Sequence, residues 1–276
     1  MPTLAPPPSA GPSIDLDAYL RRIGLCERPE PSLAFLKRLH RLHESTIPFE
    51  NLDVLLGREI SIELPAIQRK LVEQGRGGYC FEQNSLFAAA LRAIGFTVTP
   101  MLARVLWMQP TQAVPPLSHM ILRVETERGP QLADVGFGGV GLVEPISLSS
   151  TSVQHQAFEP RRLLKSGSDL SHQIQLGERW QDIYRFTPIE AAPIDLEVGN
   201  WFSFTHPKAR FRNSLLVARL AETGRIIISN NELIQRSWDG EVSRETLRSE
   251  EGRLDALGQL FGLTFPEETR FGLLDP

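Results

Sequence analysis

The chain has 276 residues, of which 41% are hydrophobic and 22% carry a charged side chain. This composition is typical of a globular protein and excludes a collagen-like or wholly disordered chain. The formal net charge is −4 and there is no basic block, which argues against a dedicated nucleic-acid binder. No run of about 18 apolar residues occurs, so we expect no membrane-spanning helix. Two cysteines, Cys26 and Cys80, are too few for a disulfide framework and favour a reducing, cytoplasmic location.

The N-terminal part, residues 13–95, is predicted to be a helical bundle. It follows a tail, residues 1–12, that is rich in Pro and Ala, lacks the features of a signal peptide and is expected to be disordered. Amphipathic patterns predict helices at Asp15–Ile23, after Ser32, at Leu64–Val72 and from Cys80 to Ile94. Glycines before and after the last of these mark its two ends.

At residue 96 the hydrophobic pattern changes to that of short strands. The predicted strands are Phe96–Met108, His119–Glu127, Gln131–Phe137, Ile146–Leu148, His155–Leu164 and Asp182–Phe186. The break Arg128-Gly129-Pro130 predicts a tight hairpin turn. Many short strands separated by turns are typical of a compact barrel or sandwich, and we assign residues 96–200 to a β-barrel.

The last part, residues 201–276, mixes strands with a helix. Alternating patterns predict strands at Asn213–Leu220, Arg225–Ser229, Leu233–Ser237 and Glu241–Leu247. Ser249 should then cap a C-terminal helix. Helices followed by strands and then by a mixed segment are typical of an α+β fold rather than an alternating βαβ chain.

Cys80 has the sequence setting of a reactive cysteine. Gly77 and Gly78 allow a sharp turn directly before the helix that begins at Cys80. The N-terminus of a helix carries a partial positive charge that favours a thiolate, and its backbone N–H groups can stabilise an oxyanion. A small buried hydrophobic residue is the alternative interpretation of Cys80. Cys26 follows Gly24 at the end of a helical pattern, and we assign it a packing role.

A thiolate nucleophile needs an imidazole base, which a carboxylate or amide orients in turn. Among six histidines, His119 stands out because it begins a predicted strand that the hairpin returns alongside Asp134. Asp134 lies among apolar residues, where an unpaired carboxylate is costly, and a hydrogen bond to His119 would satisfy it. Capping of the glycine-rich turn that follows is an equal alternative for Asp134. His40 and His43 are interpreted as surface or boundary residues.

A glycine-rich segment, Gly136–Gly141, matches the pattern G-x-G-x-x-G and follows a predicted strand. A dinucleotide site also requires a helix after the glycines, and residues 142–145 are poor helix formers, which disfavours that interpretation. A tight loop whose N–H groups contact a phosphate-bearing ligand remains open. Neither C-x-x-C nor H-E-x-x-H occurs, so no metal site is expected.

Five segments in order resemble the bacterial arylamine N-acetyltransferases: Ile47–Asp53, Arg76–Asn84, Arg104–Trp107, Ser118–Met120 and Asp134–Gly138. Residues 200–207 match more loosely. The resemblance implies a helical bundle, a β-barrel and a C-terminal α/β lid, with a Cys-His-Asp core like that of cysteine proteases and transglutaminases. It implies a catalytic triad of Cys80, His119 and Asp134. The other implied site residues are Phe49, Val105, Gly136 and Phe137 around the acceptor and coenzyme A (CoA), and a structural ion pair of Glu50 and Arg76.

The implied activity is transfer of an acetyl group from acetyl-CoA, a co-substrate, to an aromatic amine or hydrazine. It would proceed by a ping-pong route through a Cys80 thioester and serve xenobiotic metabolism. The resemblance implies no metal, nucleic-acid or membrane partner and leaves a homodimer open. Three alternatives remain: a cysteine amidase or transglutaminase-like hydrolase, a specialised amide-forming acyltransferase of biosynthesis, and a small-molecule binding protein with an inactive site.

Overall fold

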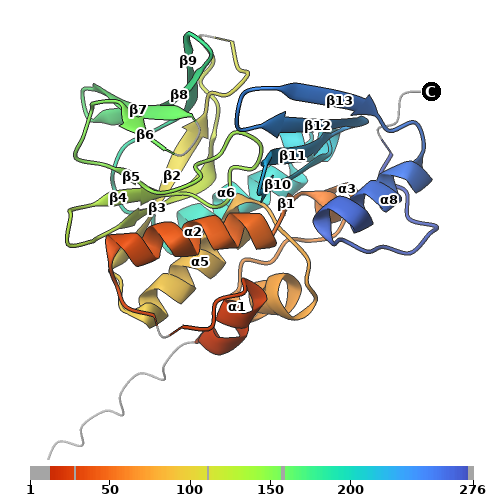
Figure 1. Cartoon of the computed structure of the whole chain (residues 1–276), viewed down its shortest axis with the longest axis horizontal. Coiled ribbons are helices and arrows are strands. Elements are labelled where there is room, and N and C mark those ends of the chain that lie inside the picture. Colours follow the sequence, from red (N-terminus) through yellow and green to blue (C-terminus); the bar gives the residue numbers. More distant parts are fainter. Residues whose placement is uncertain (1–12, 28, 111, 157–158, 273–276) are drawn as a thin grey trace, which may run out of the picture.

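The computed structural model describes residues 13–27, 29–110, 112–156 and 159–272. The expected tail, residues 1–12, lies outside these ranges. Helices from the first part of the chain pack beside an eight-stranded sheet and a five-stranded sheet (Figure 1). Within the described residues, we find no helix with the length and apolar character needed to cross a bilayer.

The N-terminal part folds into the helices that the amphipathic patterns predict, with the short helix α3 in addition. They are α1 (Leu16–Arg22), α2 (Leu33–Thr46), α3 (Leu52–Leu55), α4 (Leu64–Gln68), the π-helical turn η1 (Arg69–Glu73) and α5 (Cys80–Ile94). The Ser32 hydroxyl accepts the N–H of Phe35 and caps α2. Helix α5 ends at Gly95, whose φ of 111° is one that glycine adopts readily. Its apolar face packs into the core that α1, α2 and the central sheet share.

The eight-stranded sheet is antiparallel and runs in the order β5-β4-β3-β2-β9-β8-β7-β6. Its strands are β2 (Val98–Val105), β3 (Leu117–Val124), β4 (Gln131–Ala133), β5 (Ile146–Ser147), β6 (Gln154–His155), β7 (Pro160–Ser166), β8 (Asp169–Leu176) and β9 (Arg179–Phe186). The side chain of Gln154, on edge strand β6, hydrogen-bonds the N–H and the carbonyl of Ser147 on edge strand β5. The sheet therefore curves into an almost closed barrel (Figure 1), as the strand pattern predicts.

The five-stranded sheet draws on both ends of the chain. Its order is β1-β10-β11-β12-β13, where β1 is Phe49–Glu50 and the others are Leu216–Ala221, Gly224–Ser229, Glu232–Ser237 and Val242–Thr246. Phe49 pairs with Ala218, so a segment of the N-terminal part forms one edge of the C-terminal sheet. Helices α6 (Pro193–Thr205) and α7 (Arg210–Asn213) precede strand β10 in the chain. Helix α8 (Glu250–Phe261) follows strand β13 and is capped by Ser249.

The short elements α3, α7 and β1 were not predicted from the sequence, and two longer elements also differ from the prediction. Helix α6 continues across the expected boundary between residues 200 and 201. Ile194, Val198 and Trp201 form an exposed apolar stripe on this helix. Because apolar residues lie on its solvent side as well, the sequence lacks the amphipathic pattern from which a surface helix is predicted. Strand β8 was not expected, because its sequence is largely polar, yet it buries His172 completely.

Three side chains lie elsewhere than predicted. His40 and His43 are fully buried rather than at the surface. The Tyr19 hydroxyl lies 2.9 Å from Nδ1 of His43, and the backbone N–H of Asp134 donates to His40, so their polar atoms have partners inside the protein. Cys26 is exposed, which overturns the packing role assigned to it.

Candidate active site

Cys80 is the first residue of α5, and its side chain is only 2% exposed. The approach to it requires glycine twice. A Cβ at Gly77 would lie 2.1 Å from the carbonyl oxygen of Pro48, and one at Gly78 would lie 2.7 Å from the carboxylate of Glu82. The turn predicted from the sequence therefore passes too close to its neighbours for any side chain, and it delivers Cys80 to the start of the helix.

Strand β3 brings His119 to the same place. Nε2 of His119 lies 2.8 Å from Oδ2 of Asp134, and both side chains are buried. The hairpin register pairs Leu122 of β3 with Ala133 of β4. Asp134 thus directly follows the last paired residue, at the end of the hairpin where His119 also lies. The contact predicted from the hairpin pattern is present.

The Asp134 carboxylate is fully supplied with hydrogen-bond donors. Its Oδ1 accepts from the side-chain amide of Asn84 and from the N–H of Gly136, each at 3.0 Å. Its Oδ2 faces Nε2 of His119, so Asp134 does not engage the other ring nitrogen, Nδ1. The Cys80 thiol lies 3.7 Å from the carbonyl oxygen of Ser118, the residue before His119. Asn84 lies on α5, one turn after Cys80, so the same helix orients both ends of the cluster.

Burial and pairing together set the charges of this cluster. Burial alone would lower the pKa of His119, but the Asp134 carboxylate, together with Cys80, raises it to about 10. Burial would raise the pKa of Asp134, while His119, Asn84 and Gly136 hold it below its usual value. At neutral pH the pair is therefore an imidazolium facing a carboxylate. An imidazolium beside a thiol favours the thiolate.

Aromatic side chains surround His119. The ring of Phe137 meets it edge-on at 5.3 Å, and the ring of Tyr184 lies at 5.2 Å. Val105 of β2 pairs with Tyr184 in the barrel. Phe49 lies under the glycine loop, where a Cβ at Gly138 would be 2.8 Å from its ring. Of the residues that the resemblance places around the acceptor, Phe137 lies on the loop after Asp134 and contacts His119. Phe49 packs against the same loop, and Val105 pairs with Tyr184, whose ring also lies next to His119.

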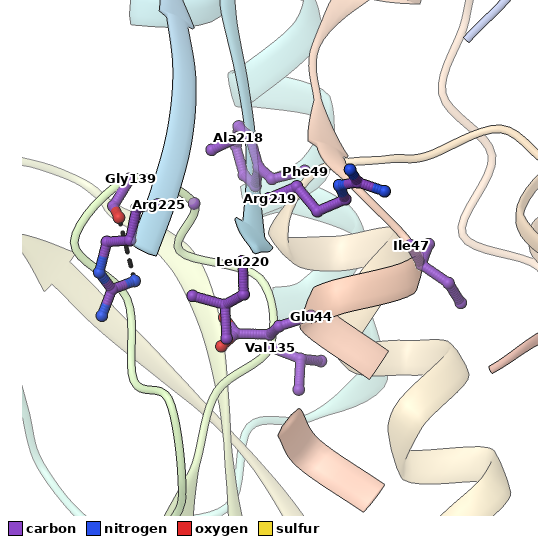
Figure 2. Close-up of a pocket in the computed structure, with 10 residues that line it drawn as sticks. Glu44, Ile47, Phe49, Val135, Gly139, Ala218, Arg219, Leu220 and Arg225 are labelled. Atoms are coloured by element: carbon purple, nitrogen blue, oxygen red, sulfur yellow. Dashed lines mark hydrogen bonds between the residues drawn. The ribbon is translucent and has the colours of Figure 1, made fainter. Parts of the chain in front are cut away.

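The glycine segment 136–141 forms a loop that leads into β5 without an intervening helix, so the dinucleotide interpretation fails here as expected. Gly136 is pressed against α5, because a Cβ there would lie 2.6 Å from Cα of Cys80. The loop is held from the other side by the guanidinium of Arg225. It donates to the carbonyl of Gly139 at 3.1 Å (Figure 2). It also donates to the carbonyl of Gly141 at 2.9 Å.

Arg161 of β7 reinforces this clamp on the loop. It donates to the carbonyls of Val140 at 2.9 Å and Gly141 at 2.8 Å, and it is fully buried. The carboxylate of Glu159 lies between Arg161 and Arg225 and pairs with both. The sequence alone does not predict this network. Arg225 and the loop are more than 80 residues apart, with separations of 84 and 86 to the two carbonyls, and no local pattern connects them.

Glu50 and Arg76 lie at the base of the cysteine turn, with 2.6 Å between the carboxylate and the guanidinium. Arg76 also reaches Asp53 at 3.2 Å, and Glu50 accepts the N–H of Leu52 at 2.9 Å. The pair therefore ties the segment after β1 to the segment before α5. In the part of the chain that the structure covers, no group of three or more His, Cys, Asp or Glu side chains is placed to hold a metal ion.

Comparison with known proteins gives the family. Residues 32–270 match the model of the N-acetyltransferase family. An arylamine N-acetyltransferase of Mycolicibacterium smegmatis is 39% identical over 91% of this chain and 92% of its own length. One of Escherichia coli strain K12 is also 39% identical, over 90% and 88%. The solved structure of Mycobacterium marinum arylamine N-acetyltransferase in complex with CoA superposes with a TM-score of 0.88 at 35% identity, covering 94% of this chain and 97% of that one. The chain therefore belongs to the arylamine N-acetyltransferase family of acyltransferases.

Proposed function

We propose that this protein transfers an acetyl group from acetyl-CoA to an aromatic amine or hydrazine, through a thioester on Cys80. The observation that carries the proposal is the buried thiol at the start of α5, next to the buried His119–Asp134 pair. The relatives are named arylamine N-acetyltransferases, and the Mycobacterium marinum protein was solved with CoA bound. Both names support the donor and the acceptor class.

In the first half-reaction, the Cys80 thiolate attacks the carbonyl carbon of acetyl-CoA while His119 holds the proton. A C–S bond to Cys80 forms, and the carbonyl electron pair moves onto oxygen. Backbone N–H groups at the start of α5 are suitable donors for this oxyanion. When the intermediate collapses, the C–S bond to CoA breaks, and the CoA thiolate leaves with the proton from His119.

In the second half-reaction, the amine nitrogen attacks the carbonyl carbon of the Cys80 thioester. His119, now neutral, takes a proton from the amine as the new C–N bond forms. The C–S bond then breaks, and Cys80 leaves as a thiolate beside the imidazolium. Asp134 keeps Nδ1 of His119 directed at the reacting atoms throughout. The rings of Phe49 and Phe137 suit an aromatic acceptor and exclude water, which would otherwise hydrolyse the thioester.

The test is mass spectrometry of the intact protein after incubation with acetyl-CoA in the absence of an acceptor. We expect one acetyl group, located on Cys80 by peptide mapping. Cys26→Ser provides the matched control, because it removes the exposed thiol and should leave the adduct in place. Cys80→Ala should remove both the adduct and turnover without unfolding the protein. If wild-type protein forms no adduct, the acetyl-transfer proposal is wrong.

The adduct measurement, together with an amide-cleavage assay and an acceptor chase, separates the alternatives. A cysteine hydrolase would cleave an amide substrate with no CoA present. A specialised amide-forming acyltransferase would form the adduct on Cys80 but would not pass the acetyl group to simple arylamines. A binding protein with an inactive site would form no adduct, although it would still bind the acceptor. An arylhydrazine is then added to the acetylated protein, and loss of the adduct is followed. Rapid loss supports transfer to aromatic amines and hydrazines, and a stable adduct supports the specialised acyltransferase.

A further inference from the structure

A lysine lies close to the first turn of α5, where it pairs with Glu82. Lys70 belongs to the π-helical turn η1 and is largely buried. Its Nζ lies 2.7 Å from Oε1 of Glu82 and 2.8 Å from Oδ2 of Asp53. Its backbone carbonyl accepts the N–H of Arg76 at 3.1 Å, which fixes η1 against the cysteine turn. A π-turn in this position is a deviation that often marks a functional site.

Glu82 brings a negative charge close to the nucleophile. It is the third residue of α5, two positions after Cys80, and is almost wholly buried. Its Oε2 accepts the N–H of Tyr79 at 3.1 Å and closes the N-terminal capping arrangement of the helix. A carboxylate there uses the same positive end of the helix that would stabilise a thiolate. Without a counter-ion, two anions would share one helix terminus.

The other charges near Cys80 are already matched. Glu50 pairs with Arg76, and Asp53 pairs with Arg76 and with the exposed Arg58 in addition to its contact with Lys70. On the opposite side, His119 of β3 faces Asp134 after β4. Burial raises the pKa of Glu82, and Lys70 is the first of the groups that oppose this rise. Among the described residues, Lys70 is the cation that forms an ion pair with Glu82.

We propose that Lys70 is a positioning residue for the nucleophile. It places a cation against the Glu82 carboxylate at the first turn of α5, so that the capping carboxylate does not oppose the Cys80 thiolate. Lys70 acts through Glu82 and touches neither substrate nor reacting atoms. The inference rests on Cys80 as the nucleophile of the proposed function.

The test measures the pH dependence of Cys80 alkylation by iodoacetamide. It is performed in a Cys26→Ser background, where Cys80 is the remaining cysteine of the sequence. Lys70→Met should raise the midpoint of alkylation by about one pH unit, roughly a tenfold loss of thiolate at fixed pH. Glu82→Gln should lower it, and the double variant Lys70→Met/Glu82→Gln should return it close to wild type. Lys70→Arg, which keeps the charge, should preserve it.

Lys37→Met is the matched control, because Lys37 pairs with Glu144 at the surface and should leave the midpoint unchanged. Thermal melting and circular dichroism report whether each variant is folded. If Lys70→Met does not fold, Glu82→Gln and the double variant decide the question. An unchanged midpoint in Lys70→Met, or an unchanged midpoint in Glu82→Gln, overturns the proposal. A purely structural role would lower the melting temperature and leave the midpoint in place.

Alkylation uses no acetyl-CoA, so failure of the two proposals can be distinguished. A shifted midpoint in a protein that forms no acetyl adduct would overturn the acetyl-transfer function and support the role of Lys70. An adduct on Cys80 together with an unshifted midpoint would support the function and overturn the role of Lys70.

Discussion

The substitution Asp134→Asn is expected to disable Cys80 by changing the protonation of His119. Oδ1 of Asp134 accepts from two donors, the Asn84 amide and the Gly136 N–H. An asparagine must keep its oxygen at that position, so its NH₂ group would face Nε2 of His119. That nitrogen must then be an acceptor, and the single ring proton moves to Nδ1, the nitrogen to which the proposed mechanism assigns the Cys80 proton. In this tautomer, His119 cannot take the thiol proton.

The size of the effect follows from the charges. The carboxylate raises the pKa of His119 to about 10 against burial, and without it we expect burial to bring the pKa below the ordinary value near 6.5. The imidazolium that favours the thiolate is then absent at neutral pH. The corresponding change in a Ser-His-Asp triad lowers kcat by a factor on the order of 10⁴. This factor equals about 5.5 kcal/mol of transition-state stabilisation.

The assay is the rate of acetyl transfer to Cys80, followed by quenched mass spectrometry between pH 6 and 10, together with iodoacetamide alkylation over the same range. Asp182→Asn is the matched control. Asp182 accepts a hydrogen bond from Gln173 in the barrel, so the variant loses a carboxylate charge away from Cys80 and should retain activity. Acetylation of Asp134→Asn within tenfold of the wild-type rate would show that the tautomer argument is wrong.

Three other changes probe the surroundings of the site. Gly136→Ala should lower the free energy of unfolding in urea by about 1–3 kcal/mol and slow acetylation, because its Cβ would lie 2.6 Å from Cα of Cys80. The control Gly258→Ala, in α8, should be neutral or stabilising in the same unfolding assay. Arg225→Met should cost about 1–3 kcal/mol in the same assay, because it removes one of the two guanidinium partners of Glu159 and the donor to the Gly139 carbonyl, while Arg161 still pairs with Glu159. A loss well below about 1 kcal/mol would contradict the clamp. Folding raises the pKa of His119 to about 10, so the stabilisation from its protonation is complete below pH 6.5 and is lost as the pH rises toward 10. Melting temperatures should therefore fall between pH 6.5 and 10, and they should fall less steeply in Asp134→Asn.

The parts of the site that the sequence predicts are those with local signals. Helix α5 begins at Cys80 and ends at Ile94 as expected, because glycines mark both ends. The approach of His119 to Asp134 followed from a hairpin, whose turn and strand pattern fix the register within a few residues. In both cases the information lies within about 20 residues of sequence.

The parts that the sequence does not predict depend on distant partners. His43 is interior because Tyr19 and Gln83 hydrogen-bond its two ring nitrogens, and nothing in the Arg-rich helix around it indicates this. The two-residue strand β1 exists because β10, more than 160 residues later, pairs with it. The clamp of Arg161 and Arg225 on the glycine loop is of the same kind. Tertiary contacts decide such features, and propensity carries little information on them.

The long separations within the cluster have a consequence during synthesis. Asp134 reaches Asn84 across 50 residues and His40 across 94. Contacts of such separation form late in folding, after local helices and hairpins. Until they form, Cys80 lies apart from the His119–Asp134 pair. On the proposed mechanism, a nascent chain therefore carries the thiol without its base, and only the completed tertiary structure brings the two together.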